Sequence, residues 1–134
     1  MIIRKLEDII GTDREVTAPN SNWTSRRLAS RDDGMGFSLH DTLIHAGTET
    51  FIWYKYHLEA VYCIEGRGEI EDLETGKVYA ISEGTLYLLN HHERHYLRAF
   101  ETLRMICVFN PPLVGSEVHT DEGFYPIAED VDTE

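Results

Sequence analysis

The chain has 134 residues, enough for one domain that buries about two-thirds of its unfolded surface. Its hydrophobic content of 42% is typical of a globular protein, and no apolar run reaches the roughly 18 residues that a membrane helix needs. The net charge of −12 repels nucleic acid and anionic membrane, so we expect neither as a partner. The opening residues do not resemble a signal peptide, and we therefore expect a cytoplasmic protein.

The N-terminal part of the chain predicts little regular structure. Residues 2–10 fit either an edge strand or a short helical turn, because the two periods cannot be separated over so few residues. Residues 12–31 are polar and predict an irregular segment with a turn at 19–22. Trp23 interrupts this segment, and its indole needs either the body of the protein or a ligand to pack against.

The middle of the chain predicts short strands separated by turns. A dense run of aromatic and β-branched residues makes 50–56 a strand. Glu65-Gly66-Arg67 predicts a hairpin connection between strands at 59–64 and 68–73. Another strand is expected at 36–45, and its alternate residues would share one face: Phe37, Leu39, Asp41, Leu43 and His45.

The C-terminal half continues this pattern at short, even spacing. Strands are expected at 77–81, 85–89, 95–100 and 103–109, and Pro111-Pro112 ends the last of them because proline cannot donate to a ladder. About eight short strands without a convincing helix predict an all-β sandwich or barrel.

A single domain should span residues 1–128, including the N-terminal segment and a lid-like C-terminal tail. Residues 129–134 form an acidic end that we expect to be disordered. Cys63 and Cys107 lie in apolar, strand-like runs without CxxC spacing, and they predict reduced, buried thiols.

The stretch from residue 57 to residue 95 holds most of the side chains that could carry chemistry. His57 and Glu59 are two residues apart, so on a strand they would face the same side. A buried carboxylate must be paired, protonated or bound to a metal, which makes Glu59 a candidate ligand. His57, His91, His92 and His95 are the candidate imidazoles, and the period-2 rule does not choose among them.

Two motifs in this stretch resemble those of cupins, a superfamily of small β-barrels. The first is the His57/Glu59 pair with its downstream glycines, and the second is Gly76-(x5)-Ser82-x-Gly84-x-x-Tyr87, followed by His95. Glu59 and Tyr87 stand where cupin motifs usually carry histidine, and Ser82 stands where they carry proline.

These departures, together with HLEAV, GxGxIEDLxTG, CVFNPP and GSEVH, resemble the ectoine synthase family. The resemblance runs from residue 1 to about residue 125 and includes IRKLEDI and the segments 23–27 and 32–38. It implies a single-domain cupin-type β-barrel, all-β, with two antiparallel sheets and little helix.

The resemblance also implies that Glu59, Tyr87 and His95 bind one metal. Two oxygen donors and one imidazole favour iron or manganese over copper and leave zinc as an alternative. Fe(II) is the metal that the family implies, and three protein ligands leave positions open for a substrate. A lone tyrosine in a strand usually belongs to a core or rim, so the resemblance and not the spacing selects Tyr87.

Ectoine synthases are hydro-lyases that close N-γ-acetyl-L-2,4-diaminobutyrate into the cyclic amidine ectoine and release water. An amide carbonyl is a poor electrophile, so the site must bring the α-amine to it and polarise it. It must also take a proton from the ammonium and give one to the departing oxygen. Water must be kept out because hydrolysis is the reverse reaction.

The implied substrate pocket combines polar and aromatic side chains. Arg27 would hold the substrate carboxylate as a bidentate fork, with Arg26 as the alternative contact. Trp23 and Phe109 would exclude water from the methylene chain. The implied binding set is Trp23, Ser25, Arg27, Thr42, Tyr54, Cys107, Phe109, Glu117 and His119.

Tyr54, Glu117 and His119 are the implied catalytic residues. Glu117 and His119 are two residues apart, so in an extended segment they would face one way and could form a proton-transfer pair. Which of the three residues acts as acid and which as base stays open.

Two other functions compete with this one. A cupin barrel can be a non-catalytic sensor of a small ligand, and it can carry other metal-dependent reactions such as dioxygenation or isomerisation. Oxygenase cupins tend to carry several histidines, whereas Glu59 and Tyr87 replace them here, which favours the synthase. The family implies a homodimer, and residues 50–56 and the N-terminal segment are the candidate contacts, because pairing would cover open sheet edges.

Overall fold

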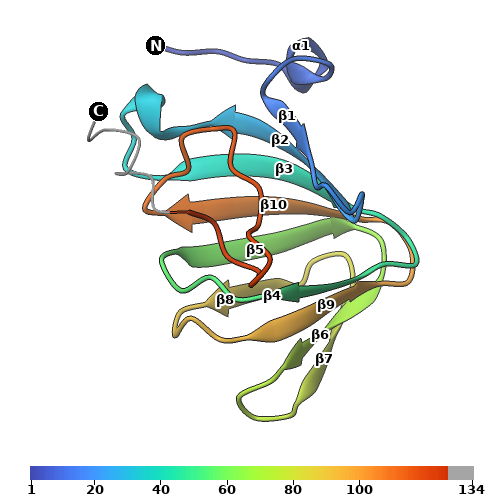
Figure 1. The fold of residues 1–134 in the computed structure, drawn as a ribbon. Helices are drawn as coiled ribbons and strands as arrows, with labels where there is room; N and C mark the ends of the chain where they lie inside the picture. Colours follow the sequence, from blue (N-terminus) through green and yellow to red (C-terminus); the bar gives the residue numbers. More distant parts are fainter. Residues whose placement is uncertain (127–134) are drawn as a thin grey trace.

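The structure is a computed structural model that describes residues 1–126, and within them two antiparallel sheets account for nearly all regular structure. One sheet has the strand order β1 (Glu15–Thr17), β2 (Trp23–Ala29), β3 (Ser38–Ile44), β10 (Leu103–Asn110), β5 (Leu58–Glu65) and β8 (Leu86–Leu89). The other has the order β4 (Glu49–Ile52), β9 (His95–Ala99), β6 (Gly68–Asp72) and β7 (Val78–Ile81). Figure 1 shows the two sheets, with the single-turn helix α1 (Leu6–Ile9) at the N-terminal end.

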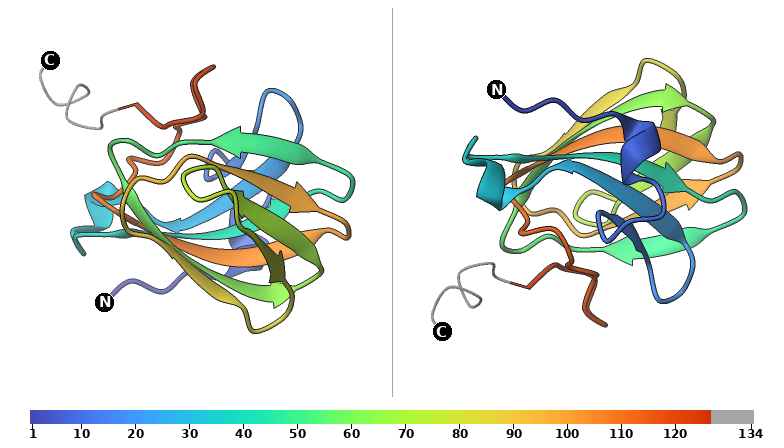
Figure 2. Two further views of the ribbon diagram at one scale, coloured as in Figure 1. Left: turned by 90° about the horizontal axis from the view of Figure 1, so that it is seen from below. Right: turned by 90° about the horizontal axis from the view of Figure 1, so that it is seen from above.

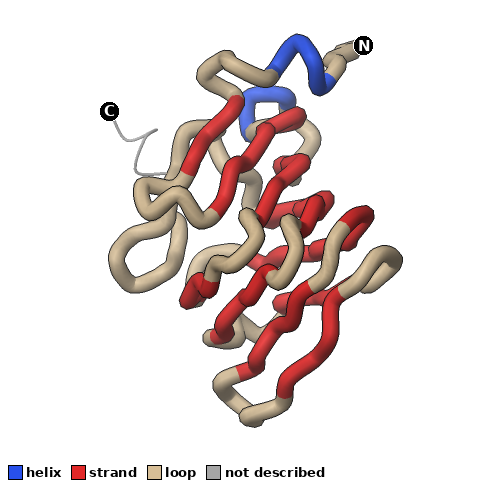
Figure 3. The backbone as a smooth tube through the Cα atoms, turned by 90° about the vertical axis from the view of Figure 1, so that its right-hand side faces the viewer, coloured by secondary structure: helices blue, strands red, loops and turns tan. Residues whose placement is uncertain are grey.

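The core lies where the inward faces of the sheets meet. Val61 of β5 and Met105 of β10 come from the larger sheet, and Ile70 of β6 and Leu97 of β9 come from the smaller one. Burying each such side chain contributes about 1.5–3 kcal/mol. The predicted all-β, two-sheet cupin-type fold with little helix is therefore confirmed (Figures 2 and 3).

The prediction of an irregular segment over residues 12–31 is wrong. These residues contain β1 and the seven-residue strand β2, which pairs with β3. Trp23, Ser25 and Arg27 alternate on the buried face of β2. Two of these three inward side chains are polar, so β2 lacks the alternation of apolar and polar residues that marks a half-buried strand.

The predicted hairpin at Glu65-Gly66-Arg67 is also wrong. The strand before it, β5, pairs with β10 and β8, whereas the strand after it, β6, pairs with β9 and β7, so the connection passes from one sheet to the other. Gly66 has φ +93°, and a Cβ there would overlap the backbone oxygen of Thr102. A hairpin and a crossing between sheets have similar local sequences.

The remaining strands agree with the sequence, with one shortened. The expected strand at 50–56 ends at Ile52, after which Trp53 leaves the ladder and donates its N–H to the Gly123 carbonyl, 2.9 Å away. Residues 2–10 contain a helical turn, not an edge strand. The strands expected at 77–81, 85–89, 95–100 and 103–109 are confirmed as β7 to β10, with boundaries one residue away or less.

The outward face of β3 matches the predicted alternation and explains a charged residue on it. Asp41 is 3% exposed and accepts hydrogen bonds from Arg26 at 2.8 Å and Arg104 at 2.7 Å. Burial alone would raise the pKa of Asp41, but these two guanidinium hydrogen bonds lower it overall. The Asp41 carboxylate of β3 therefore links β2 and β10 through hydrogen bonds on the outward face of the sheet.

After β10 the chain turns back along the sheets (Figure 1). Leu113 starts this return by donating its N–H to Ser38 Oγ at 3.0 Å.

Cys63 and Cys107 are free and buried, as predicted. No helix within residues 1–126 has the length and apolar character to cross a membrane. The predicted acidic end at 129–134 lies outside the described residues, so the domain boundary at 128 stays a prediction.

Candidate active site

A small cavity of about 30 Å³ lies between the two sheets. Most of the residues implied by the sequence line it: Trp23, Thr42, Tyr54, Glu59, Tyr87, Cys107, Phe109 and His119. Six further lining residues were not among them: His40, Ile44, Ile52, Leu97, Met105 and Tyr125. A volume of this size holds about two water molecules, so the side chains around it are tightly packed.

Glu59 and Tyr87 are neighbours on the larger sheet. Glu59 on β5 lies opposite Leu89 of β8, and Tyr87 lies opposite Val61, so the two side chains are diagonal neighbours on the inward face. Glu59 is 7% exposed. Burial raises the pKa of Glu59 to about 8, although a hydrogen bond with the Cys107 thiol partly offsets this.

His95 faces them from the smaller sheet. It is 1% exposed, and its Nδ1 is 3.0 Å from the Glu93 carbonyl oxygen. A carbonyl only accepts, so Nδ1 carries the proton and Nε2 presents its lone pair. That Nε2 is buried and has no hydrogen-bond partner. Tyr87 lines the cavity together with Glu59 and a groove beside it together with His95.

This donor set fits a divalent cation. Burial, followed by the charge of Glu59, raises the pKa of Tyr87 well above its usual value, so two buried oxygen anions here would need a cation to be stable. The lone Nε2 of His95 adds a nitrogen donor without a competing partner. Within residues 1–126 no three His, Cys, Asp or Glu side chains gather closely enough to hold a metal, so the set depends on Tyr87.

The other candidate imidazoles are placed differently. His91 and His92 are exposed, and His92 Nδ1 lies 2.7 Å from the Tyr54 carbonyl oxygen. His57 is 1% exposed, and neither of its ring nitrogens has a partner, but it packs edge-on against Phe109 and does not line the cavity. The geometry therefore favours His95 for the ligand set.

Arg27 lies behind the cavity wall, with its guanidinium 5.8 Å from the ring of Tyr125, which lines the cavity. It is fully buried, its Nε donates to Ser25 Oγ at 3.2 Å, and both terminal nitrogens lack hydrogen-bond partners. Its nearest carboxylate is that of Glu117, 3.9 Å from Nη1. Arg26, the alternative, points outward to Asp41. A buried guanidinium with two free ends is suited to a ligand carboxylate.

The catalytic candidates form a different pair from the one expected. The Tyr54 hydroxyl lies 2.9 Å from His119 Nε2. Glu117 instead accepts the backbone N–H groups of Val114 and Gly115, both at 2.9 Å. No hydrogen bond or ion pair among the described residues joins Glu117 to His119, so the structure does not support them as a proton-transfer pair.

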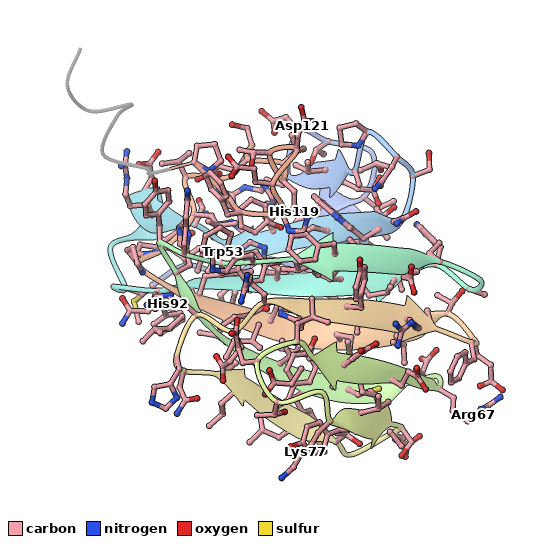
Figure 4. All side chains as sticks on the ribbon, turned by 60° about the horizontal axis from the view of Figure 1, so that its bottom comes forward. Trp53, Arg67, Lys77, His92, His119 and Asp121 are labelled. Carbon is pink, nitrogen blue, oxygen red and sulfur yellow. The ribbon has the colours of Figure 1, made fainter. Side chains whose placement is uncertain are left out.

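Burial keeps both rings of this pair neutral. Burial, then the charges of Arg27 and His95, lowers the pKa of His119 to about 3. Burial also raises the pKa of Tyr54 well above its usual value. In a neutral His119 ring one nitrogen donates and the other accepts, so the tautomer sets whether the Tyr54 hydroxyl donates to Nε2 or accepts from it. Figure 4 shows His119 against the barrel, with Asp121 further out on the same segment.

Among the cavity-lining residues that sequence reasoning missed, two carry polar groups, Tyr125 and His40. Tyr125 stacks on Tyr54 with ring centres 5.2 Å apart and has its ring 5.8 Å from the Arg27 guanidinium. It lies in a tail without periodicity, so no local signal could reveal it. His40 sits on β3 between Ser38 and Thr42, and period-2 alternation with Thr42 could have placed it on the inward face.

The comparisons with known proteins agree on one family. The family model described as ectoine synthase matches residues 1–129. L-ectoine synthase from Virgibacillus pantothenticus is 62% identical over 95% of this chain and 98% of its own length. L-ectoine synthase from Desulfatibacillum aliphaticivorans is 56% identical over 97% of this chain and 100% of its own length.

Solved structures give the same result. The crystal structure of ectoine synthase from P. lautus superposes with a TM-score of 0.85 at 56% identity, covering 96% of this chain and 91% of the other. The polyketide cyclase RemF from Streptomyces resistomycificus has a TM-score of 0.67 at 20% identity over 91% of this chain and 89% of its own, which shows the fold alone. With sequence motifs, fold and relatives in agreement, the chain belongs to the ectoine synthase family.

Proposed function

We propose that this protein is a lyase that closes N-γ-acetyl-L-2,4-diaminobutyrate into ectoine. The α-amine nitrogen forms a bond to the acetyl carbonyl carbon, and the carbonyl oxygen leaves as water, so the ring closes as an amidine. The observation that carries this proposal is the cavity between the sheets, which Glu59 and Tyr87 line, with the guanidinium of Arg27 5.8 Å from the ring of Tyr125 on its wall and both terminal nitrogens of Arg27 without hydrogen-bond partners. Membership of the family over nearly the whole chain supports it.

The cavity walls would hold the substrate in a folded conformation. Arg27, with Ser25 and Thr42 beside it, binds the carboxylate, and Trp23 and Phe109 exclude water from the methylene chain. Holding the α-amine against the carbonyl supplies part of the activation free energy as orientation. Tyr125 and His119 fill part of the space, so the segment that carries them has to move outward to admit the substrate and then return over it.

Tyr54 and His119 are the groups best placed to move protons. The neutral His119 ring is able to take a proton, and the Tyr54 hydroxyl bonded to it is able to give one. A proton leaving the substrate ammonium could pass along this hydrogen bond to the departing oxygen. Cys107 and Glu117 complete the set that would contact the substrate.

Glu59, Tyr87 and His95 would hold the metal, which we propose is Fe(II), with other divalent transition metals as substitutes. When bound, it supplies Lewis acidity that polarises the acetyl carbonyl. The residues themselves provide two buried oxygens and one imidazole lone pair fixed by the Glu93 carbonyl. That carbonyl sets which nitrogen of His95 is protonated.

A homodimer in the cytoplasm completes the proposal. Strand β8 stands at the edge of its sheet with Leu86 57% and Leu88 55% exposed, and the N-terminal residues Ile2 and Ile3 are also exposed, so a second copy would cover apolar surface. The free thiols Cys63 and Cys107 fit a reducing compartment. Light scattering after gel filtration should give twice the monomer mass, and Leu88→Glu should halve it.

An activity assay with controlled metal content tests the reaction. Protein stripped by a chelator would be incubated anaerobically with the acetylated diaminobutyrate, with and without added Fe(II), and ectoine would be followed by chromatography. Product that forms only with Fe(II) is the expected result. Metal binding without product would instead favour a cupin sensor, and product without any metal would remove the metal from the proposal.

A further inference from the structure

A chain of buried hydrogen bonds runs along the wall of the cavity from the tail to Arg27. Leu113 N–H donates to Ser38 Oγ at 3.0 Å, and Ser38 Oγ lies 3.0 Å from His40 Nε2. His40 Nδ1 lies 3.1 Å from Ser25 Oγ, which also accepts from Arg27 Nε at 3.2 Å. Ser38, His40 and Ser25 are each at most 2% exposed, so water does not satisfy them from outside.

The direction of this chain decides what Ser25 offers a ligand. Two of its members have only one possible role: the Leu113 N–H and the Arg27 Nε–H must both donate. The neutral His40 ring donates from one nitrogen and accepts at the other, so just two arrangements exist. Burial, then the charges of Arg27 and His57, holds the pKa of His40 well below its usual value, which keeps the ring neutral.

In the first arrangement Ser38 donates to Nε2 and the Nδ1–H of His40 donates to Ser25. Ser38 is then satisfied as both donor and acceptor. Ser25 accepts from His40 and Arg27, and Thr42 Oγ1 approaches it at 3.5 Å as a further donor, so the proton of Ser25 has no acceptor in the described protein. An acceptor atom of a ligand beside Arg27 would take that proton.

In the second arrangement Ser25 donates to Nδ1 and the Nε2–H of His40 donates to Ser38. Ser38 then accepts twice, from His40 and from Leu113, and its own proton has no acceptor among the described residues. Ser38 is fully buried between His40 and Leu113, whereas Ser25 lies beside Arg27 and 3.5 Å from Thr42, which lines the cavity. A ligand that enters beside Thr42 and Arg27 therefore reaches Ser25 and not Ser38. A buried hydroxyl without an acceptor is unfavourable, so the first arrangement alone becomes fully satisfied when a ligand binds.

We propose that His40 is a positioning residue that, held by Ser38 in the Nδ1–H tautomer, turns the Ser25 hydroxyl into a hydrogen-bond donor for the substrate carboxylate. Ser25 O–H and the two free ends of Arg27 then form one anion-binding group. The identity of the carboxylate rests on the proposed function, whereas the tautomer does not.

Nitrogen NMR of histidine-labelled, metal-free protein tests the tautomer directly, because protonated and unprotonated ring nitrogens resonate far apart. The His40 signals would be assigned by their absence in His40→Asn. With the acetylated diaminobutyrate bound and no metal present to support turnover, the Nδ1 of His40 should carry the proton. Protonation at Nε2 in that complex would overturn the proposal, whether or not the protein makes ectoine.

Two substitutions test whether His40 orients the Ser25 hydroxyl or only fills space. The amide nitrogen of His40→Asn lies near the position of Nδ1 and can still donate to Ser25, whereas that of His40→Gln lies near Nε2. KM for the substrate should be about tenfold higher in His40→Gln than in His40→Asn, with kcat within about threefold. Equal KM values in two folded variants would contradict the proposal.

Two controls complete the design. In a Ser25→Ala background the difference between the two His40 variants should disappear, because the donor that His40 sets is gone. His45→Gln changes a histidine outside the barrel, where His45 bonds Thr24 at 2.9 Å, and should leave KM as in the parent protein. Should both His40 variants fail to fold, the NMR result on the unmodified chain decides.

Discussion

The two ends of the cavity are held in different ways. Glu59, Tyr87 and His95 stand on β5, β8 and β9, whose register is set by ladders of backbone hydrogen bonds on both sheets. His119 and Tyr125 stand on irregular backbone after β10, where side-chain contacts take the place of a ladder. The candidate metal ligands are thus part of the barrel, and the candidate proton-transfer residue His119 is part of a docked segment.

That docked segment rests on a few contacts. The Trp53 N–H donates to the Gly123 carbonyl at 2.9 Å, and Lys55 Nζ lies 4.1 Å from the centre of the Phe124 ring. The cavity beneath holds only about 30 Å³, too little for a substrate with the tail in this position. The strands can therefore keep the geometry of the candidate metal ligands while the tail moves to admit the substrate.

Removing the carboxylate at the metal end should have the largest effect. Glu59→Gln keeps the shape of the side chain but removes an anionic ligand, so turnover should fall by more than about a thousandfold and bound iron should be lost. Metal analysis, product chromatography and circular dichroism would be run together. Turnover close to that of the unmodified chain would remove Glu59 from the ligand set.

The same substitution should change the stability of the metal-free protein in a pH-dependent way. Burial raises the pKa of Glu59 from its ordinary value of 4.5 to about 8 in the folded chain. As pH rises from about 4.5 to about 8, the unfolded chain loses this proton while the folded chain keeps it, so the folded state becomes less stable. The Glu59→Gln variant has no such carboxyl group and does not lose this stability. Near pH 8 its free energy of unfolding should exceed that of the metal-free wild type by on the order of a few kcal/mol.

Urea titrations at about pH 5 and about pH 8 measure that difference. It should shrink toward the lower pH, because the unfolded carboxyl also becomes protonated there. Added Fe(II) should reverse the order by stabilising the protein that retains the carboxylate. A difference that is constant with pH would mean that Glu59 is ionised in the metal-free fold.

Two glycine substitutions compare the barrel with the tail directly. A Cβ at Gly66 would overlap the Thr102 backbone oxygen, whereas one at Gly123 would lie 2.9 Å from the Phe51 backbone oxygen, and both residues have positive φ. Gly66→Ala should lower the free energy of unfolding by roughly 3–5 kcal/mol. Gly123→Ala should undock the tail, raising KM about tenfold while the melting temperature changes by only a few degrees. Equal loss of melting temperature in both would show that tail and barrel unfold as one unit.

The smallest effect is expected from Lys55. Lys55→Met keeps the length of the side chain but removes the cation that faces Phe124 and Trp53. Exposed cation–π contacts contribute about 0.5–1 kcal/mol each, so KM should rise about threefold with little change in melting temperature. Lys77→Met, at an exposed turn on the far side from His119 in Figure 4, is the matched control. An identical KM in the two variants would mean that Lys55 does not help hold the tail.

Local sequence patterns predicted most strands because period-2 alternation depends only on neighbouring residues. They failed at β2, where Ser25 and Arg27 face inward, and at Gly66, where the strands on either side belong to different sheets. Strand partners depend on contacts between distant residues, which a local pattern does not contain.

For the candidate site too, local sequence features could be predicted and contacts between distant residues could not. The fold class, the His57/Glu59 periodicity and, through the motifs, the family and the residues that the family implies could all be predicted from the sequence. Three features appear only in the folded molecule: His95 presents a free Nε2, Arg27 and not Arg26 faces inward with two terminal nitrogens that lack hydrogen-bond partners, and Tyr54 pairs with His119. Whether a buried atom has a partner depends on everything packed around it, and those neighbours come from strands far apart in the chain.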